Sequence, residues 1–155
     1  MTSIHITQLT KTYGTRNAVD SLSLDIEEGE LFALLGLNGA GKTTTIKMLC
    51  CLLKPTSGDA TLLGDSILSD QAAVKQKINV SPQETAIAPN LTVKENLELI
   101  SMIYGSNKLE AASKATEQMQ ALNIEDRAND KAKTLSGGVQ RRLSIAMALI
   151  SNPSI

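Results

Sequence analysis

A glycine-rich segment followed by a lysine and two threonines is the part of the sequence best suited to chemistry. Residues 36–44 read GLNGAGKTT and fit the spacing G-x-x-x-x-G-K-[ST]. Successive backbone N–H groups of a tight loop, together with the positive end of a helix, form a concave site for phosphate. The Lys42 ammonium adds a full charge for the β- and γ-phosphates, and the Thr43 hydroxyl is suited to Mg²⁺. The segment therefore predicts a nucleoside triphosphate site.

Two other interpretations of the same glycines fit less well. Gly39 and Gly41 match the first pair of the dinucleotide-binding pattern G-x-G-x-x-G, but Thr44 stands where the third glycine is needed. An ordinary glycine turn before a helix is the second alternative. The residues around the loop favour the phosphate site, because an apolar run precedes it and helix-compatible sequence follows it.

The elements that must position the loop can be predicted from apolar patterning. The short apolar run 31–35 predicts a strand buried on both faces, and residues 44–53 predict the helix after the loop. Alternation in Ile4-x-Ile6 and Leu22-x-Leu24-x-Ile26 predicts half-buried strands of an antiparallel sheet, with His5 on the outer face. Further expected elements are short strands at 60–63 and 78–80 and a helix within 67–77.

Beyond residue 84 the pattern becomes helical. Thr92-x-x-Glu95 fits a capping box and is followed by a helical face of apolar residues. A second stripe predicts another helix, and Ser136 can cap a third helix with Gly137 and Gly138 in its first turn. The three predicted apolar faces are Val93, Leu97, Ile100 and Tyr104; Ala112, Ala115, Met119 and Leu122; and Val139, Leu143, Ala146, Met147 and Ile150.

Composition limits the classes of function. The chain has 155 residues with 42% hydrophobic and 20% charged residues, typical of a globular domain. A net charge of −1 gives no general attraction to nucleic acid or to an anionic membrane. The longest apolar runs are too short to span a bilayer, so we expect a cytoplasmic chain whose membrane role depends on a partner. Cys50 and Cys51 lack metal-site spacing and are expected as small core side chains.

The segment 135–142, read LSGGVQRR, adds a second specific motif. Together with the glycine loop, Tyr13 and Gln83, it makes the chain resemble the nucleotide-binding domain of an ABC transporter. The resemblance implies an α/β fold: a P-loop NTPase (RecA-like) core with an antiparallel β subdomain and an inserted helical subdomain. On this basis residues 1–83 and 140–155 are expected to form the core with the antiparallel subdomain, and residues 84–139 the helical subdomain with the signature motif.

The resemblance also implies roles for individual residues. Tyr13 matches the aromatic residue that stacks on adenine, although a tyrosine in a surface turn is the simpler alternative. Gln83 matches the glutamine that touches Mg²⁺ and the attacking water, and whose loop senses the membrane partner. Ser136, Gly137 and Gly138 match the signature that holds the γ-phosphate of ATP on an opposite subunit, although a plain helix cap is the alternative. The full expected set is Lys42 and Gln83 for catalysis; Tyr13, Gly36, Leu37, Asn38, Gly39, Ala40, Gly41, Lys42, Thr43, Thr44, Ser136, Gly137, Gly138 and Gln140 for ATP; and Thr43 and Gln83 for Mg²⁺.

The implied function is that of an ATP-binding subunit that couples ATP binding and hydrolysis to transport. Its expected partners are a membrane-spanning subunit and a second ATP-binding subunit, paired head to tail, and its expected place is the cytoplasmic face of the membrane. The region around the glycine loop resembles subunits of drug-, antibiotic- or sodium-exporting systems. A soluble ABC-type ATP switch and a nucleotide-binding remnant without turnover are the alternatives.

The family pattern includes residues that this sequence does not contain. In the family, a segment like 151–155 leads into a strand ending in Asp-Glu, which supports Mg²⁺ and polarises water, and a later loop supplies a histidine. These residues would lie beyond Ile155. The resemblance therefore predicts that the sequence is the N-terminal portion of such a domain and that residues 1–155 alone hydrolyse ATP poorly.

Overall fold

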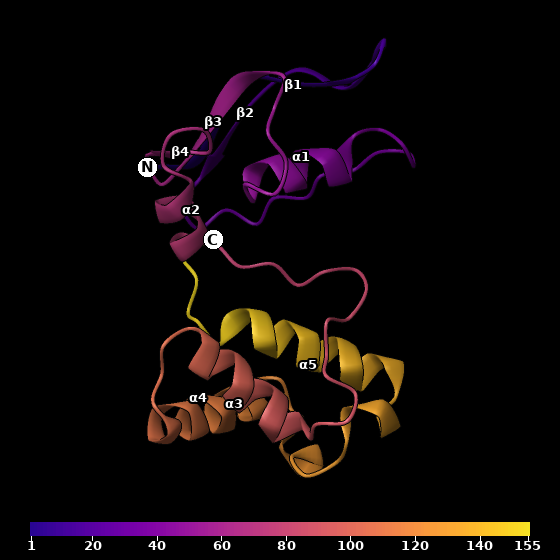
Figure 1. The fold of residues 1–155 in the computed structure, drawn as a ribbon, viewed down its shortest axis with the longest axis vertical. Helices are drawn as coiled ribbons and strands as arrows, with labels where there is room; N and C mark the ends of the chain where they lie inside the picture. The colour runs from indigo at the N-terminus through magenta and orange to yellow at the C-terminus, as the bar shows by residue number, and fades with distance from the viewer. The chain divides into compact units, whose positions relative to one another are not determined.

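A computed structural model describes residues 1–155, which form two compact units. One unit contains residues 1–78 and Ile155, and the other contains residues 79–154. The first is built on an antiparallel sheet with two helices, and the second is helical (Figure 1). The predicted α/β class with an antiparallel sheet and a helical part is confirmed.

The sheet of the first unit has the strand order β2-β1-β3-β4. Its strands are β1 (Thr2–Tyr13), β2 (Arg16–Glu27), β3 (Ser57–Leu62) and β4 (Asp65–Ser66), all paired antiparallel. Ile4 pairs with Ile26 and Ile6 with Leu24, so the predicted alternating strands are confirmed. His5 lies on the exposed face, as expected, where it contacts Asp25 of β2.

One face of the sheet carries the core of this unit. Helix α1 (Lys42–Leu49) packs into that core through Met48 and Leu49, and helix α2 (Gln71–Lys77) through Val74. Packing of helices against the alternating apolar side chains of the strands removes both surfaces from water. The buried core residues are Ile4, Ile6, Leu9, Val19, Met48, Leu49, Ala60, Leu62, Ile67 and Val74.

Two predicted strands and one helix boundary are wrong. Residues 31–35 and 78–80 form no strand, and Leu31 and Leu35 are 99% and 87% exposed. A buried strand needs neighbouring strands for its backbone groups, and no strand in the 155 residues pairs with either segment. Helix α1 ends at Leu49 rather than at residue 53, because Cys51 adopts φ +54°, outside the helical region.

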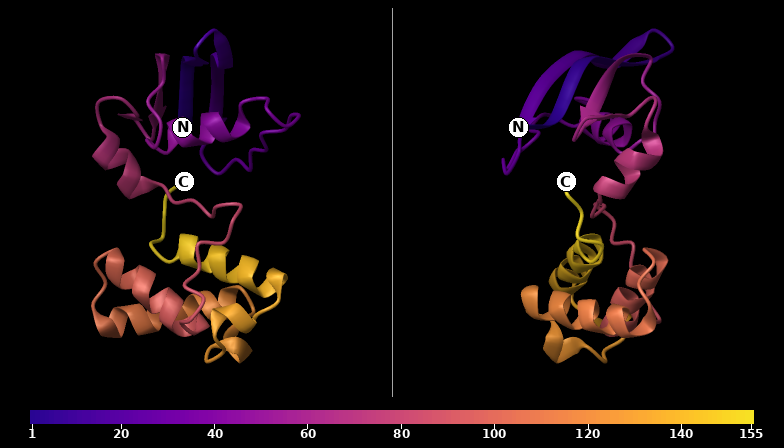
Figure 2. Two further views of the ribbon diagram at one scale, coloured as in Figure 1. Left: turned by 45° about the vertical axis from the view of Figure 1, so that its right-hand side comes forward. Right: turned by 90° about the vertical axis from the view of Figure 1, so that its left-hand side faces the viewer.

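The second unit is built on α3 (Val93–Ile103), α4 (Lys108–Ala121) and α5 (Gly137–Leu149), with short 3₁₀ turns η1 (Glu125–Arg127) and η2 (Ala132–Thr134). Both α4 and α5 contact α3 (Figure 2). The predicted capping box at Thr92 and Glu95 is confirmed. The buried core is Val93, Leu97, Ala115, Met119, Ile124, Ala132, Leu143, Ala146 and Ile150.

The predicted apolar face of α3 is too long at its C-terminal end. Tyr104 is the C-cap of α3 and is 52% exposed, because the helix ends there and Gly105 turns the chain away. Helix α5 packs with α3 and α4 in the unit 79–154, and the assignment of residues 140–155 to the core stays a prediction. No helix in the structure has both the length and the apolar character needed to cross a membrane.

Candidate functional site

The glycine loop leads directly into the N-terminus of α1. Gly41 is the N-cap, and its carbonyl oxygen accepts hydrogen bonds from the Thr45 N–H (2.8 Å) and the Thr45 hydroxyl (3.0 Å). Within the loop, the Ala40 N–H donates to the Leu37 carbonyl oxygen at 3.1 Å. The first turn of α1 contains no acidic residue and has no side-chain cap. The positive end of this helix is therefore free to attract an anion.

Gly41 is required by the close approach of the loop to β2. Its φ is +89°, and a Cβ built on it would lie 2.2 Å from the carbonyl oxygen of Ala18. Gly39 has a similar φ of +86°, but a Cβ there would meet nothing within 4 Å. Strand β2 therefore holds the C-terminal part of the loop in place, while Gly39 contributes only its backbone conformation.

The ammonium of Lys42 lies inside the loop. Its Nζ donates to the carbonyl oxygens of Gly36 at 2.6 Å and Leu37 at 2.8 Å. An ammonium has three N–H donors, so these two bonds leave a third for another acceptor. The charge therefore lies within the loop, at the residue where α1 begins, which favours an anionic ligand such as a phosphate.

The other predicted residues of the loop surround this charge. Leu37, Asn38 and Ala40 lie in the exposed turn, and Thr43 and Thr44 follow Lys42 in the first turn of α1. Thr43 is exposed, so its hydroxyl is open to a ligand. A triphosphate with Mg²⁺ fits this donor set, since the phosphates meet N–H groups and an ammonium while a hydroxyl oxygen is accessible to a hard cation.

Two hollows adjoin the loop. One, of about 380 Å³, is lined by Lys42, Gly39, Ala40, Thr45 and several residues of β2 and of the segment before the loop. The other, of about 340 Å³, is lined by Tyr13, Arg16, Ala18 and Gly39. The structure thus brings Tyr13, which is 54% exposed, to the same hollow as the glycine loop. A planar base stacked on the Tyr13 ring would lie beside the phosphate site.

The remaining predicted site residues belong to the second unit. Gln83 is exposed in the segment before α3, and the Arg141 guanidinium donates to the carbonyl oxygen of the preceding Pro82. Ser136 is the N-cap of α5, its hydroxyl makes no cap bond, and no acidic residue occupies the first turn. Cβ atoms built on Gly137 and Gly138 would meet nothing within 4 Å, so nothing inside the chain requires glycine there.

Two residues next to the signature have structural contacts that the sequence analysis missed. The Gln140 amide donates to the carbonyl oxygens of Ala132 (3.1 Å) and Leu135 (3.3 Å), so it holds the segment that leads into the signature. Arg142 donates to the carbonyl oxygens of Leu122 and Asn123, which directly follow α4. These partners lie up to 20 residues away, beyond any local sequence signal.

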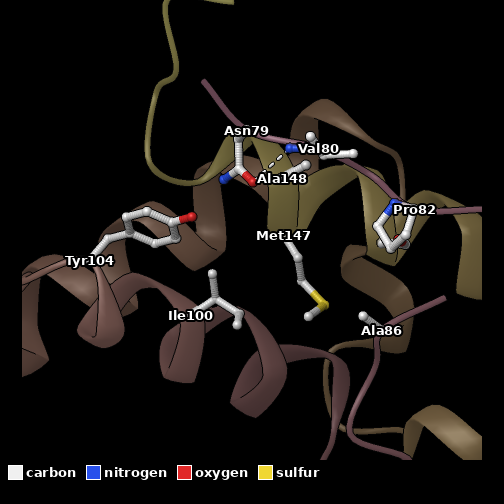
Figure 3. A pocket seen from close by; sticks show the side chains of 9 residues that line it. Asn79, Val80, Pro82, Ala86, Ile100, Tyr104, Met147 and Ala148 are labelled. Atoms are coloured by element: carbon white, nitrogen blue, oxygen red, sulfur yellow. Dashed lines mark hydrogen bonds between the residues drawn. The ribbon is translucent and has the colours of Figure 1, made fainter. Parts of the chain in front are cut away.

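The second unit also contains an apolar groove of about 150 Å³ that the sequence did not predict. Ile100 of α3, Tyr104 at the C-cap of α3 and Met147 of α5 line it, together with the segment that precedes Gln83 (Figure 3). The groove has a largely hydrophobic lining, with Ser144 among its few polar residues.

Comparison with known proteins identifies relatives that match most of the chain. Residues 19–155 match the family described as ABC transporter. The linearmycin resistance ATP-binding protein LnrL of Bacillus subtilis is 42% identical over 94% of this chain and 47% of its own length. The Nod factor export ATP-binding protein I of Cupriavidus metallidurans is 37% identical over 94% of this chain and 48% of its own length.

Solved structures agree with these matches. A dimeric structure of the ATP-binding cassette MJ0796 bound to ADP and Pi superposes with a TM-score of 0.83 and 31% identity, over 97% of this chain and 70% of that one. An ATP-binding subunit of an ABC transporter gives a TM-score of 0.82 with 26% identity, over 97% and 62%. The likeness confirms the predicted P-loop nucleotide-binding fold.

The chain spans about half the length of the curated relatives it matches. Within that span, the match includes both the glycine loop at Lys42 and the signature at Ser136. With the family matched over residues 19–155 and the fold shared with ATP-binding cassettes, the chain belongs to the ATP-binding domains of the ABC transporter family.

Proposed function

We propose that the chain is the ATP-binding subunit of an ABC transporter of the exporting kind. It binds ATP with Mg²⁺ and couples ATP binding and hydrolysis to transport by a membrane-spanning partner. The observation that carries this proposal is the Lys42 ammonium, which lies inside a glycine loop at the uncapped N-terminus of α1. The names of the relatives, which refer to linearmycin resistance and to Nod factor export, support the exporting class.

Each part of the loop has a role in this proposal. Free backbone N–H groups within residues 36–44 and the Lys42 ammonium bind the β- and γ-phosphates, and Tyr13 stacks on adenine. Mg²⁺, when bound, neutralises phosphate charge, and the Thr43 hydroxyl and Gln83 side chain are its candidate protein ligands. Lys42 stabilises negative charge during phosphoryl transfer, while Gln83 orients the attacking water.

The signature serves a second copy or a related subunit. Ser136, Gly137 and Gly138 offer a free hydroxyl and backbone N–H groups at the start of α5, with no acidic side chain in its first turn. This arrangement suits the γ-phosphate of ATP held by the partner in a head-to-tail pair. The dimeric cassette among the similar structures supports such a pair. The Gln140 side-chain amide holds the segment before the signature through hydrogen bonds to the carbonyl oxygens of Ala132 and Leu135.

The membrane-spanning partner is proposed to contact the segment that carries Gln83. That segment borders the apolar groove lined by Ile100, Tyr104 and Met147, which offers a surface for an apolar side chain of the partner. Through this contact the chain would lie at the cytoplasmic face of the membrane. The division into a core of residues 1–83 and 140–155 and a helical subdomain of residues 84–139 belongs to the same proposal.

A comparison of two lysines in α1 tests the ATP site. We expect Lys42→Ala to weaken binding of ATP with Mg²⁺ by tenfold or more, because charge-assisted hydrogen bonds contribute roughly 1.5–3 kcal/mol. Lys47→Ala removes the same charge from the last turn of the same helix and serves as the control. Titration calorimetry gives both affinities. Equal affinities of the two variants and the wild type would disprove the phosphate site.

A substitution in the signature tests the role of the second subunit. We expect Gly138→Asp to leave ATP binding to one chain unchanged and to prevent ATP-dependent dimer formation, because its carboxylate repels the γ-phosphate of the partner's ATP. Sedimentation with and without ATP measures dimer formation, and calorimetry measures binding. If the substitution removed ATP binding from a chain shown to be monomeric, the signature would not act across a dimer.

A further inference from the structure

We propose that Arg16 is a nucleotide-binding residue whose guanidinium contacts the phosphate closest to the nucleoside. The inference extends the ATP site proposed above and rests on it. The chemical group recognised is the phosphate of a nucleoside 5′-phosphate.

The hairpin between β1 and β2 fixes the position of Arg16. Tyr13 and Arg16 are directly paired across the two strands, with only Gly14 and Thr15 between them. Gly14 has φ +58°, as a tight two-residue turn requires. Directly opposed residues of an antiparallel pair have neighbouring side chains. Arg16 is therefore held beside the ring on which adenine is proposed to stack.

Arg16 lines a hollow beside the glycine loop. The other residues that line it are Tyr13, Ala18 and Gly39 of the loop. In a nucleotide with its base on Tyr13 and its terminal phosphates at Lys42, the first phosphate lies between the base and the terminal phosphates, so we expect it in this hollow. The volume of about 340 Å³ is large enough for a ribose and a phosphate group.

The two cationic side chains near Tyr13, Lys11 and Arg16, differ in the contacts they already make within the chain. The Lys11 ammonium donates to the Lys54 carbonyl oxygen at 2.7 Å and lies 5.5 Å from the centroid of the Tyr13 ring. Arg16 is exposed and belongs to none of the ion pairs of the structure. A guanidinium can bind two phosphate oxygens at once and keeps its charge at every physiological pH. Arg16 is thus the cation of this hairpin that is available to a ligand.

The affinities of the full chain for ATP, AMP and adenosine test the assignment. We expect Arg16→Met to lower the affinity for ATP and for AMP about tenfold, because the phosphate contact is lost. The affinity for adenosine should stay the same, because adenosine has no phosphate. Arg16→Lys should keep part of the AMP affinity, since the charge remains without the paired donors. Lys11→Met is the control: it removes a charge from the same pair of strands, and we expect its ratio of AMP to adenosine affinity to stay at the wild-type value.

The possible results separate this inference from the ATP site itself. If Arg16→Met lowered the affinity for adenosine as much as the affinity for AMP, Arg16 would act only on the position of the Tyr13 ring, and the inference would be wrong. Unchanged AMP and ATP affinities in Arg16→Met would also refute it, while the ATP site would stand. A wild-type chain that bound neither ATP nor inorganic triphosphate would overturn the ATP site and this inference with it. Thermal melting of each variant verifies that it is folded.

Discussion

The contact between Gly41 and β2 allows a quantitative test of the loop. In Gly41→Ala, the new Cβ would lie 2.2 Å from the Ala18 carbonyl oxygen, whereas ordinary contacts begin at 3.4 Å. The loop or the strand must therefore move. A non-glycine residue at φ +89° adds a conformational cost of about 1–2 kcal/mol, and overpacking typically adds about 1–3 kcal/mol. We expect a total cost of about 2–5 kcal/mol.

Gly39→Ala is the matched control for this cost. Its φ of +86° carries a similar conformational cost, but its Cβ would meet nothing within 4 Å. The difference between Gly41→Ala and Gly39→Ala therefore isolates the steric contact with β2. Relative to Gly39→Ala, we expect Gly41→Ala to bind ATP at least about fivefold more weakly, corresponding to about 1 kcal/mol or more.

Titration calorimetry with ATP and Mg²⁺ measures the affinities, and thermal melting measures stability. If the loop stays on β2, a loss of about 1 kcal/mol in the free energy of unfolding lowers the melting midpoint of a chain of this size by roughly 2–4 °C. If the loop instead detaches from β2, the midpoint changes little and ATP binding is lost. Equal ATP affinity in Gly41→Ala and Gly39→Ala would refute the argument that the contact with Ala18 shapes the phosphate site.

Three further predictions concern the signature helix, a capping box and the adjacent thiols. Gly138→Ala should raise the melting midpoint of the chain, because alanine fits the open space and favours the helix by up to about 1 kcal/mol; a lower midpoint would contradict this. Hydrogen bonds from the Thr92 backbone and side chain lower the pKa of Glu95, so its stabilising effect is complete above the usual glutamate range and is lost as pH falls through the lowered pKa. Melting at a series of pH values should therefore show a smaller loss on acidification for Glu95→Gln than for the wild type. Burial raises the pKa of the Cys50 and Cys51 thiols, so iodoacetamide at neutral pH should alkylate the native chain more slowly than the chain unfolded in denaturant.

The local features of the fold were predictable because they depend on local physics. Ile4 and Ile6 alternate with polar residues because β1 buries one face, and Thr92 and Glu95 satisfy the N-terminus of α3 within one turn. Residues 31–35 show the limit of such reasoning. Their composition fits a buried strand, but a strand exists only where another segment pairs with it, and the pattern of one segment carries no information about that partner.

The candidate site likewise combines features that depend on local sequence with features that depend on distant parts of the chain. The spacing of residues 36–44 predicts a phosphate loop, since the required groups are contiguous in the chain. That Tyr13 shares a hollow with Gly39 could be expected only from the family resemblance, because the two residues come together through the sheet and the loop. The contacts of Gln140 and Arg142 with distant carbonyl oxygens likewise depend on how α5 packs against its neighbours.

The exposed segment 31–35 has a consequence for the behaviour of the purified chain in solution. Leu31, Phe32 and Leu35 present apolar surface without a charge or a proline among residues 31–35, and the backbone there belongs to no sheet. Such a segment can template strand pairing between molecules. A net charge of −1 provides little repulsion to keep two molecules apart. We therefore expect turbidity to rise steeply with protein concentration, and Leu35→Lys to suppress it by placing a charge in the segment.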